Sequence, residues 1–285
     1  ITLDGREIHR DTVKVRRPRA EHDQKCSVTL KLPGAKLWSP KEPNLHLLGV
    51  KLGDDDMIER IGVRQVTVKG RQIRLNNQPL KLLGFNRHEG SAQTGHAQPW
   101  HLLVTDVQQL KDMGVNFIRG SHYPQDQRFL DLCDEAGICV WVESIGWQHN
   151  EKHLNDGKFI GAQLNIIDEM IAVARNRPSV IMWGLLNEST SMDPKSRKGY
   201  KTLIDRIRKR DASRPVTYAT NHPWDDKCLD LVDIVSLNTY PGWYWADIES
   251  VPADLDKTIR HLDSWPQCRS KPLIVSEIGA EGIYG

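Results

Sequence analysis

The sequence predicts an α/β protein in which a small β-sandwich precedes a β/α barrel. The first 66 residues show short alternating runs broken by Pro and Gly, as antiparallel strands with one solvated face do. After Leu80, short apolar runs alternate with longer helical stretches, which indicates a parallel sheet covered by helices. The length of 285 residues suits one large domain and one smaller one.

The composition is that of an ordinary globular protein and indicates no nucleic-acid or membrane partner. The chain is 39% hydrophobic and 27% charged, with a formal net charge of +2. Residues 14–19 are basic and are interpreted as a solvated strand or loop. No apolar run approaches the roughly 18 residues that would suggest a membrane span. The start at Ile1 looks trimmed, so no localisation is predicted.

The five cysteines are predicted to be free thiols. They are widely spaced and form no CxxC pair or Cys/His cluster that could bind zinc. A disulfide between Cys133 and Cys139 is geometrically conceivable, because both flank a helix-to-strand turn, but two separate buried thiols are favoured. No metal and no other cofactor is predicted.

Residues 1–66 are assigned to the sandwich, and the clearest strand candidates in it are Thr12–Val15 and Cys26–Leu32. The next segment, Val66–Leu80, is predicted to be a hairpin in which Asn76 and Asn77 supply left-handed turn residues. We expect this hairpin to cover the bottom of the barrel.

Residues 67–285 are assigned to the barrel. The predicted strands are Leu82–Asn86, Phe117–Ser121, Cys139–Ser144, Val180–Leu186, Val216–Thr220, Ile234–Asn238 and Leu273–Ser276. The predicted helices are His101–Met113, Gln125–Ala136, Leu164–Asn176, Arg197–Asp211 and Ala253–Ser264. Asp126 is placed to cap the start of the second helix, and Gly137 to end it.

Seven strands are visible, and the sequence ends at Gly285 before an eighth. We therefore expect a (β/α)8 TIM-type barrel truncated after strand seven and lacking its last β/α unit. Either the chain is a fragment whose missing segments complete the wall, or a neighbouring copy completes it in a homo-oligomer. A doubly wound sheet competes with this architecture, but no GxGxxG loop follows the first strand.

Polar residues accumulate where the predicted strands end. In a β/α barrel these ends converge on one mouth, where active sites are built, so a shared polar pocket is expected. The residues concerned are Asn86–Glu89, Arg119–Tyr123, Glu143, Asn187–Glu188, Asn238–Tyr240 and Glu277.

Two of these residues, Glu188 and Glu277, form the carboxylate pair that glycoside hydrolysis requires. One carboxyl group protonates the leaving oxygen, and the other meets the oxocarbenium-like carbon. Arg119 and the phenol of Tyr240 are the candidates for holding Glu277 ionised, which leaves Glu188 as the proton donor. Asn187, which both donates and accepts hydrogen bonds, is suited to gripping a sugar hydroxyl.

Five motifs in this order resemble glycoside hydrolase family 2, which includes β-galactosidases, β-glucuronidases and β-mannosidases. They are Phe85–Glu89, Ser121–Pro124, Asn187–Glu188 after a Trp-containing strand, Asn238–Tyr244, and Ser276–Glu277. The resemblance covers nearly all of the chain, including an immunoglobulin-like domain for residues 1–66. It implies a retaining double displacement with Glu188 as general acid/base and Glu277 as nucleophile, their carboxyl groups about 5 to 5.5 Å apart.

The resemblance also implies sugar contacts by His88 and His122. Glu143 is either a pocket residue or a partner of Arg119, and these alternatives stay open. Trp243 and Tyr244, together with Trp147, are candidates for stacking on sugar faces, although aromatic residues also simply pack.

The predicted function is that of a retaining exo-β-glycosidase with a carbohydrate substrate. Gly90 stands where similar β-glucuronidases have an aspartate, so a β-galactosidase-like specificity is preferred and a β-glucuronidase is the alternative. An alternative of another class is a catalytically silent carbohydrate-binding or scaffold fragment.

Overall fold

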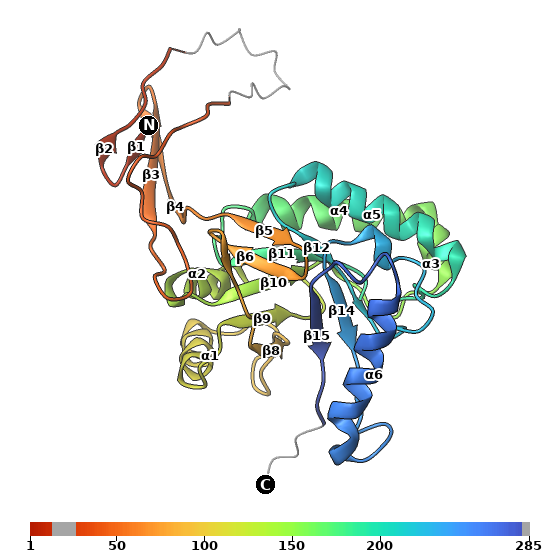
Figure 1. The fold of residues 1–285 in the computed structure, drawn as a ribbon. Coiled ribbons are helices and arrows are strands. Elements are labelled where there is room, and N and C mark those ends of the chain that lie inside the picture. The colour runs from red at the N-terminus through yellow and green to blue at the C-terminus, as the bar shows by residue number, and fades with distance from the viewer. Residues whose placement is uncertain (13–26, 281–285) are drawn as a thin grey trace.

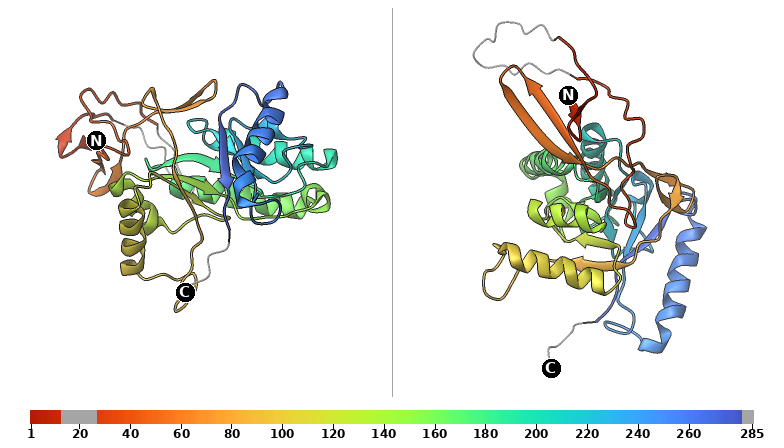
Figure 2. Two further views of the ribbon diagram at one scale, coloured as in Figure 1. Left: turned by 60° about the horizontal axis from the view of Figure 1, so that its bottom comes forward. Right: turned by 90° about the vertical axis from the view of Figure 1, so that its left-hand side faces the viewer.

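The computed structural model describes residues 1–12 and 27–280 and shows a curved parallel sheet with helices on its outer side (Figures 1 and 2). Five strands run in the order β12-β11-β10-β9-β8, and a second sheet has the order β13-β14-β15. Strands β12 and β13 are the halves of one predicted strand, which is interrupted at Tyr218. The strands are β8 (Gly84–Arg87), β9 (Phe117–Gly120), β10 (Cys139–Glu143), β11 (Val180–Gly184), β12 (Val216–Thr217), β13 (Ala219–Thr220), β14 (Val235–Asn238) and β15 (Leu273–Glu277).

Each of the five predicted helices is present, with shifted ends. The helices are α1 (Trp100–Asp112), α2 (Gln127–Ala136), α3 (Glu151–Asn155), α4 (Gly157–Ala174), α5 (Arg197–Arg210) and α6 (Val251–Ser264), with short 3-10 turns at Pro194–Ser196, Leu229–Leu231 and Ile248–Ser250. The prediction missed α3 and placed the start of α4 too late. Helix α4 begins after Asp156, whose side chain caps it by accepting from the backbone of Lys158 and Phe159, and this capping signal was overlooked. The caps at Asp126 and Gly137 are confirmed.

The hairpin of residues 66–79 closes the bottom of the barrel, as predicted. Its strands are β5 (Val66–Lys69), β6 (Gln72–Leu75) and β7 (Gln78–Pro79), and Asn76 and Asn77 have left-handed φ angles of 51° and 65°. Val66, Ile73 and Leu75 pack in one buried cluster with the first residues of two barrel strands, Phe117 and Cys139. A separate and larger core lies between the sheet and the helices.

The N-terminal segment forms one antiparallel sheet in the order β2-β1-β3-β4. Its strands are β1 (Thr2–Leu3), β2 (Arg6–Glu7), β3 (His46–Leu52) and β4 (Asp55–Ile61). The hairpin β3–β4 extends away from the barrel (Figure 2). Most of the predicted strand Thr12–Val15, and Cys26, lie outside the described residues, and residues 27–32 form no strand, so that part of the prediction was wrong. The immunoglobulin-like sandwich remains a prediction.

The described part of the barrel is open between β8 and β15. Strand β8 pairs with β9 alone, and β15 with β14 alone, among the described residues. Leu83 and Phe85, at the β8 edge, are 58% and 53% exposed. Completion of the wall by an eighth β/α unit or by a second copy remains a prediction.

The four cysteines within the described residues, at positions 133, 139, 228 and 268, are free and buried, which agrees with the predicted thiols. Among the described helices, none is both long and apolar enough to span a membrane.

Candidate active site

The parallel strands bring the predicted polar residues to the mouth of the barrel because their carboxyl ends lie at the same edge of the sheet. Side chains alternate along each strand, so Arg119 on β9 and Glu143 on β10 project into the barrel like Phe117 and Trp141 below them. The guanidinium of Arg119 lies 4.7 Å from the centre of the Trp141 ring. Apolar layers thus fill the base of the barrel, and a charged layer begins directly above them.

Glu277, the last residue of β15, is held by two donors. Arg119 donates from Nη1 to Oε1 at 2.6 Å, and Tyr240 donates from its hydroxyl to Oε2. Burial lowers the pKa of Arg119, but the negative charges of Glu143 and Glu277 outweigh it and raise that pKa overall. Burial, and then the hydrogen bond to Glu277, raise the pKa of Tyr240. Both donors therefore keep their protons, and each donates to a separate oxygen of Glu277.

Glu143 is a partner of Arg119, which settles one alternative that the sequence left open. Its side chain is 1% exposed and accepts from Nε of Arg119. Burial raises the pKa of Glu143, but the Arg119 charge and the nearby His122, whose Nδ1 lies 3.6 Å from Oε2, lower it overall. Glu143 thus has almost no exposed surface, and its side chain contacts Arg119.

Glu188 follows β11 in a loop with unusual backbone geometry, since Leu186 and Glu188 both have left-handed φ angles, of 50° and 48°. Asn238 donates from Nδ2 to Glu188 Oε1 at 2.8 Å and to Asn187 Oδ1 at 3.0 Å. Arg119 also donates to Asn187 Oδ1, at 2.8 Å. A chain of contacts through Arg119, Asn187 and Asn238 therefore connects the two glutamates.

Asn238 was not among the predicted site residues, although it ends β14 in one of the polar strand-end runs. Ser276, which donates to Asn238 Oδ1 at 2.8 Å, was also missed as a site residue. The position of Asn238 at the end of a predicted strand was the feature of the sequence that could have identified it as a site residue.

The two predicted histidines lie next to each other at the same mouth. Their ring centres are 5.2 Å apart, and His122 Nε2 is 3.9 Å from Glu277 Oε1. Burial, and then the neighbouring His122, lower the pKa of His88. Glu89, beside His88, is bound to Arg87 at 3.3 Å.

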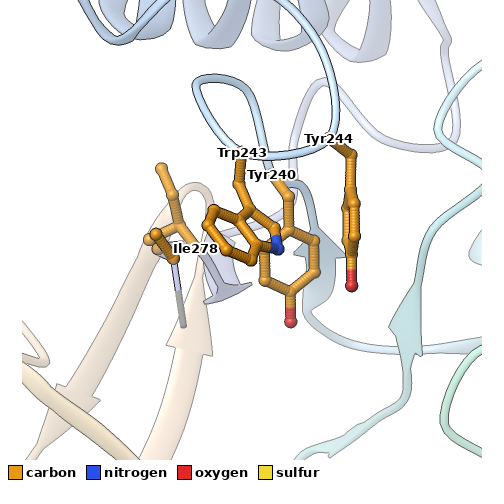
Figure 3. A pocket seen from close by; sticks show the side chains of 6 residues that line it. Tyr240, Trp243, Tyr244 and Ile278 are labelled. Carbon is orange, nitrogen blue, oxygen red and sulfur yellow. The ribbon is translucent and has the colours of Figure 1, made fainter. Parts of the chain in front are cut away.

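An aromatic pocket adjoins Glu277. It has a volume of about 340 Å³ and is lined by Tyr240, Trp243, Tyr244, Ile278, Gly279 and Ala280. Figure 3 shows Trp243 and Tyr244 on one loop beside Tyr240, with both tyrosine hydroxyls pointing the same way. Trp243 and Tyr244 are 45% and 72% exposed. They therefore present aromatic surface next to the carboxylate.

Another aromatic residue, Trp147, lies beside the Asn187–Glu188 loop. Asn187 donates from its backbone to Gly146 at 3.1 Å, and Gln148 donates to the backbone of Asn187 at 2.8 Å. These bonds hold Trp147 opposite Asn187 in a parallel bridge, and Trp147 is 61% exposed.

The ten residues predicted for the site all lie at this mouth of the barrel.

The chain is similar to known proteins over most of its length. The family model described as "Glycosyl hydrolases family 2, TIM barrel domain" matches residues 66–285. The β-glucuronidase of Sus scrofa is 32% identical over 272 residues, which cover 90% of this chain and 41% of that protein. That of Homo sapiens is 31% identical, with the same coverage.

Two solved structures are similar as well. A family 2 β-galacturonidase from Eisenbergiella tayi, bound to galacturonate, has 38% identity and a TM-score of 0.87 over 91% of this chain and 46% of that one. A β-D-glucuronidase for Dictyoglomus thermophilum has 31% identity and a TM-score of 0.81 over 90% and 46%.

The chain spans less than half the length of these relatives. None of the four is named a β-galactosidase, so the expected preference for β-galactosides gains no support from them. The match of the family model to most of the chain, together with these identities, shows that the chain belongs to glycoside hydrolase family 2.

Proposed function

We propose that the protein carrying this chain is a retaining exo-β-glycosidase that removes terminal β-linked uronic acid residues. The observation that carries the proposal is that the two glutamates accept hydrogen bonds from different kinds of donor. Glu277 accepts from a guanidinium and a phenol, whereas Glu188 accepts from the neutral amide of Asn238. Such a difference suits one ionised nucleophile and one proton donor.

In the first step, Glu277 attacks the anomeric carbon while Glu188 gives its proton to the glycosidic oxygen. The bond from that carbon to the leaving oxygen breaks, and the sugar becomes an ester of Glu277. In the second step, Glu188 takes a proton from water, whose oxygen attacks the same carbon and releases Glu277 as a carboxylate. Two displacements retain the β configuration.

The surrounding residues support these roles through charge and hydrogen bonding. When Glu277 becomes an ester it loses its charge, and Arg119 then still has Glu143 as a buried partner. This arrangement avoids leaving an unpaired buried guanidinium in the covalent intermediate.

Asn187 is placed to bind the sugar. Its side-chain oxygen accepts from Arg119 and Asn238, and its Nδ2 makes no hydrogen bond to the described part of the chain. That amide group is therefore oriented and left to donate to a sugar hydroxyl. His122 and the aromatic pocket complete the proposed sugar site.

Uronide specificity is proposed because the similar glucuronidases and the galacturonidase act on uronides. The β-galactosidase reading rests on Gly90 alone and becomes the runner-up. Exo action is proposed because a pocket of about 340 Å³ adjoins Glu277.

A panel of nitrophenyl β-glycosides tests this proposal in the full-length natural protein. We expect release of nitrophenol from the glucuronide or the galacturonide, weaker or no release from the galactoside and glucoside, and loss of release in Glu277→Ala. Faster release of nitrophenol from the galactoside than from either uronide would favour the β-galactosidase specificity instead. Silence across the panel, with sugar binding retained, would instead favour a silent binding protein.

A further inference from the structure

A carboxylate with no role in the proposed chemistry, Asp226, is buried behind the loop that carries Glu188. It is 3% exposed and forms no ion pair within residues 1–12 and 27–280. Its Oδ2 accepts from Ser191 Oγ at 2.6 Å. Its Oδ1 accepts from Tyr218 Oη and from the backbone of Cys228, both at 2.7 Å.

Burying a carboxylate without a cation is costly unless several donors replace its water. Three donors surround Asp226: the Cys228 backbone comes from its own turn, and Ser191 and Tyr218 come from two other segments of the chain. If this position only had to be filled, an apolar residue of similar volume would do so at a lower cost in folding free energy. We therefore explain the burial of Asp226 by the two chain segments that its carboxylate oxygens join.

One connection is to the loop after Glu188. Ser191 lies three residues beyond Glu188 and is itself 1% exposed. Its carbonyl accepts from the backbone of Lys227 at 2.9 Å and from Cys228 Sγ at 3.8 Å, so residues 226–228 hold the loop at Ser191 through three contacts. Between these positions, Ser189 Oγ accepts from the backbone of His149 at 3.0 Å.

The other connection is to the interruption between β12 and β13, where Tyr218 is fully buried. Burial, and then the charge of Asp226, raise the pKa of Tyr218, so its phenol remains a donor. Glu188 is bound to the next residue of that strand, since its backbone donates to Ala219 at 3.0 Å. Asp226 thus joins both supports of the Glu188 loop.

The loop needs such bracing because of its backbone. Leu186 and Glu188 both adopt left-handed φ angles, which non-glycine residues leave unless surrounding contacts hold them. The side chain of Glu188 has one hydrogen bond within the described residues, to Asn238. Its direction is therefore set mainly by the loop.

We propose that Asp226 is a positioning residue for the general acid/base, acting through Ser191 and Tyr218 to hold the loop that aims Glu188 at the glycosidic oxygen. This inference rests on the proposed function of Glu188. It assigns Asp226 no contact with the substrate.

The test compares substrates whose leaving groups differ in their need for a proton. Cleavage of an alkyl β-glycoside requires a proton from Glu188, whereas dinitrophenolate leaves without one. In Ser191→Ala and in Asp226→Asn of the full-length protein, kcat/KM for the alkyl glycoside should fall by about tenfold or more. The value for the dinitrophenyl glycoside should stay within about twofold of wild type.

A matched control is Asp134→Asn, which alters another buried carboxylate, 1% exposed, at the opposite end of the barrel, where it accepts from the backbone of Ser179. It should leave the ratio of the two kcat/KM values unchanged. Equal losses on both substrates in Ser191→Ala would show ordinary structural damage and overturn the inference. If Asp226→Asn fails to fold, Ser191→Ala still decides, because it removes the link without touching the carboxylate. A wild-type protein inactive on both substrates would contradict the proposed function itself.

Discussion

Arg119 and Glu277 are 158 residues apart in the sequence, and their side chains form a 2.6 Å charge-assisted hydrogen bond at the mouth of the barrel. The same guanidinium also contacts Glu143 and Asn187. One side chain therefore fixes the proposed nucleophile relative to the residue that precedes the proposed acid. A fork of five N–H groups makes this possible, and a lysine ammonium could not reproduce it.

Replacing Arg119 by Lys should lower kcat by about 10²- to 10³-fold, because the preorganised donors around Glu277 are lost. It should also destabilise the fold, since removing the partner of a buried charge typically costs about 3–5 kcal/mol and Lys is an imperfect substitute. Steady-state kinetics and urea unfolding measure the two effects. The control Arg71→Lys changes an exposed ion pair with Asp263 and should have little effect on either. Normal turnover in Arg119→Lys would contradict the role given to Arg119.

Replacing Glu188 by Gln should reveal its two roles separately. For an alkyl glycoside, kcat/KM should fall by about 10²- to 10⁴-fold, because the proton donor is missing. For a dinitrophenyl glycoside, kcat/KM should change little, while kcat falls because water now attacks without a base. Added azide should restore that kcat, since the anion needs no base. Equal losses for both substrates would argue against Glu188 as the acid.

Trp147 is expected to bind the leaving group, because its loop is bonded to the residue next to Glu188. Trp147→Ala should lower kcat/KM for aryl glycosides by about three- to tenfold, the value of a lost aromatic contact, and should leave methyl glycosides unaffected. Trp224→Ala is the matched control. Trp224 is 47% exposed and packs against His261 instead. The same loss in both variants, or on methyl glycosides, would refute this role.

Asp134 should make stability depend on pH. Burial raises its pKa from 3.8 to about 6 in the fold, so its full contribution is present below about pH 4 and is lost as the pH rises through 6. Between pH 4 and 7, Asp134→Asn should therefore gain on the order of 2–3 kcal/mol of unfolding free energy relative to wild type.

Urea unfolding at several pH values measures this difference. Asp168→Asn is the control, because a hydrogen bond from Arg210 lowers the pKa of Asp168 and its contribution is instead lost as the pH falls. A difference between Asp134→Asn and wild type that does not vary with pH would contradict the prediction.

The barrel strands, and the position of the ten candidate residues at one end of the sheet, could be predicted because the pattern behind each is local. For example, the apolar run that predicts a strand and the polar pair Asn187–Glu188 that follows it are adjacent in the sequence. The support of the site could not be predicted in this way. Asp226 and Ser191 are 35 residues apart, and nothing in their neighbours shows that they meet.

The N-terminal part was the weakest prediction for a similar reason. Short alternating runs such as Cys26–Leu32 become strands only if a partner strand pairs with them, and residues 27–32 have none in the structure. The break at Tyr218 was also missed, because the neighbouring residues give no sign that the Tyr218 phenol is buried and donates to Asp226, eight residues further along the chain.

The central claim, that Glu277 forms a covalent bond to the sugar, is tested most directly by trapping. A 2-deoxy-2-fluoro-β-uronosyl fluoride should react with the full-length protein and, because water attacks the resulting ester slowly, should remain attached. Mass spectrometry of proteolytic fragments is predicted to find one sugar on the peptide that contains Glu277, and none on that peptide in Glu277→Ala. A label on Glu188 or on any other residue, or release of a product with inverted configuration, would contradict the account.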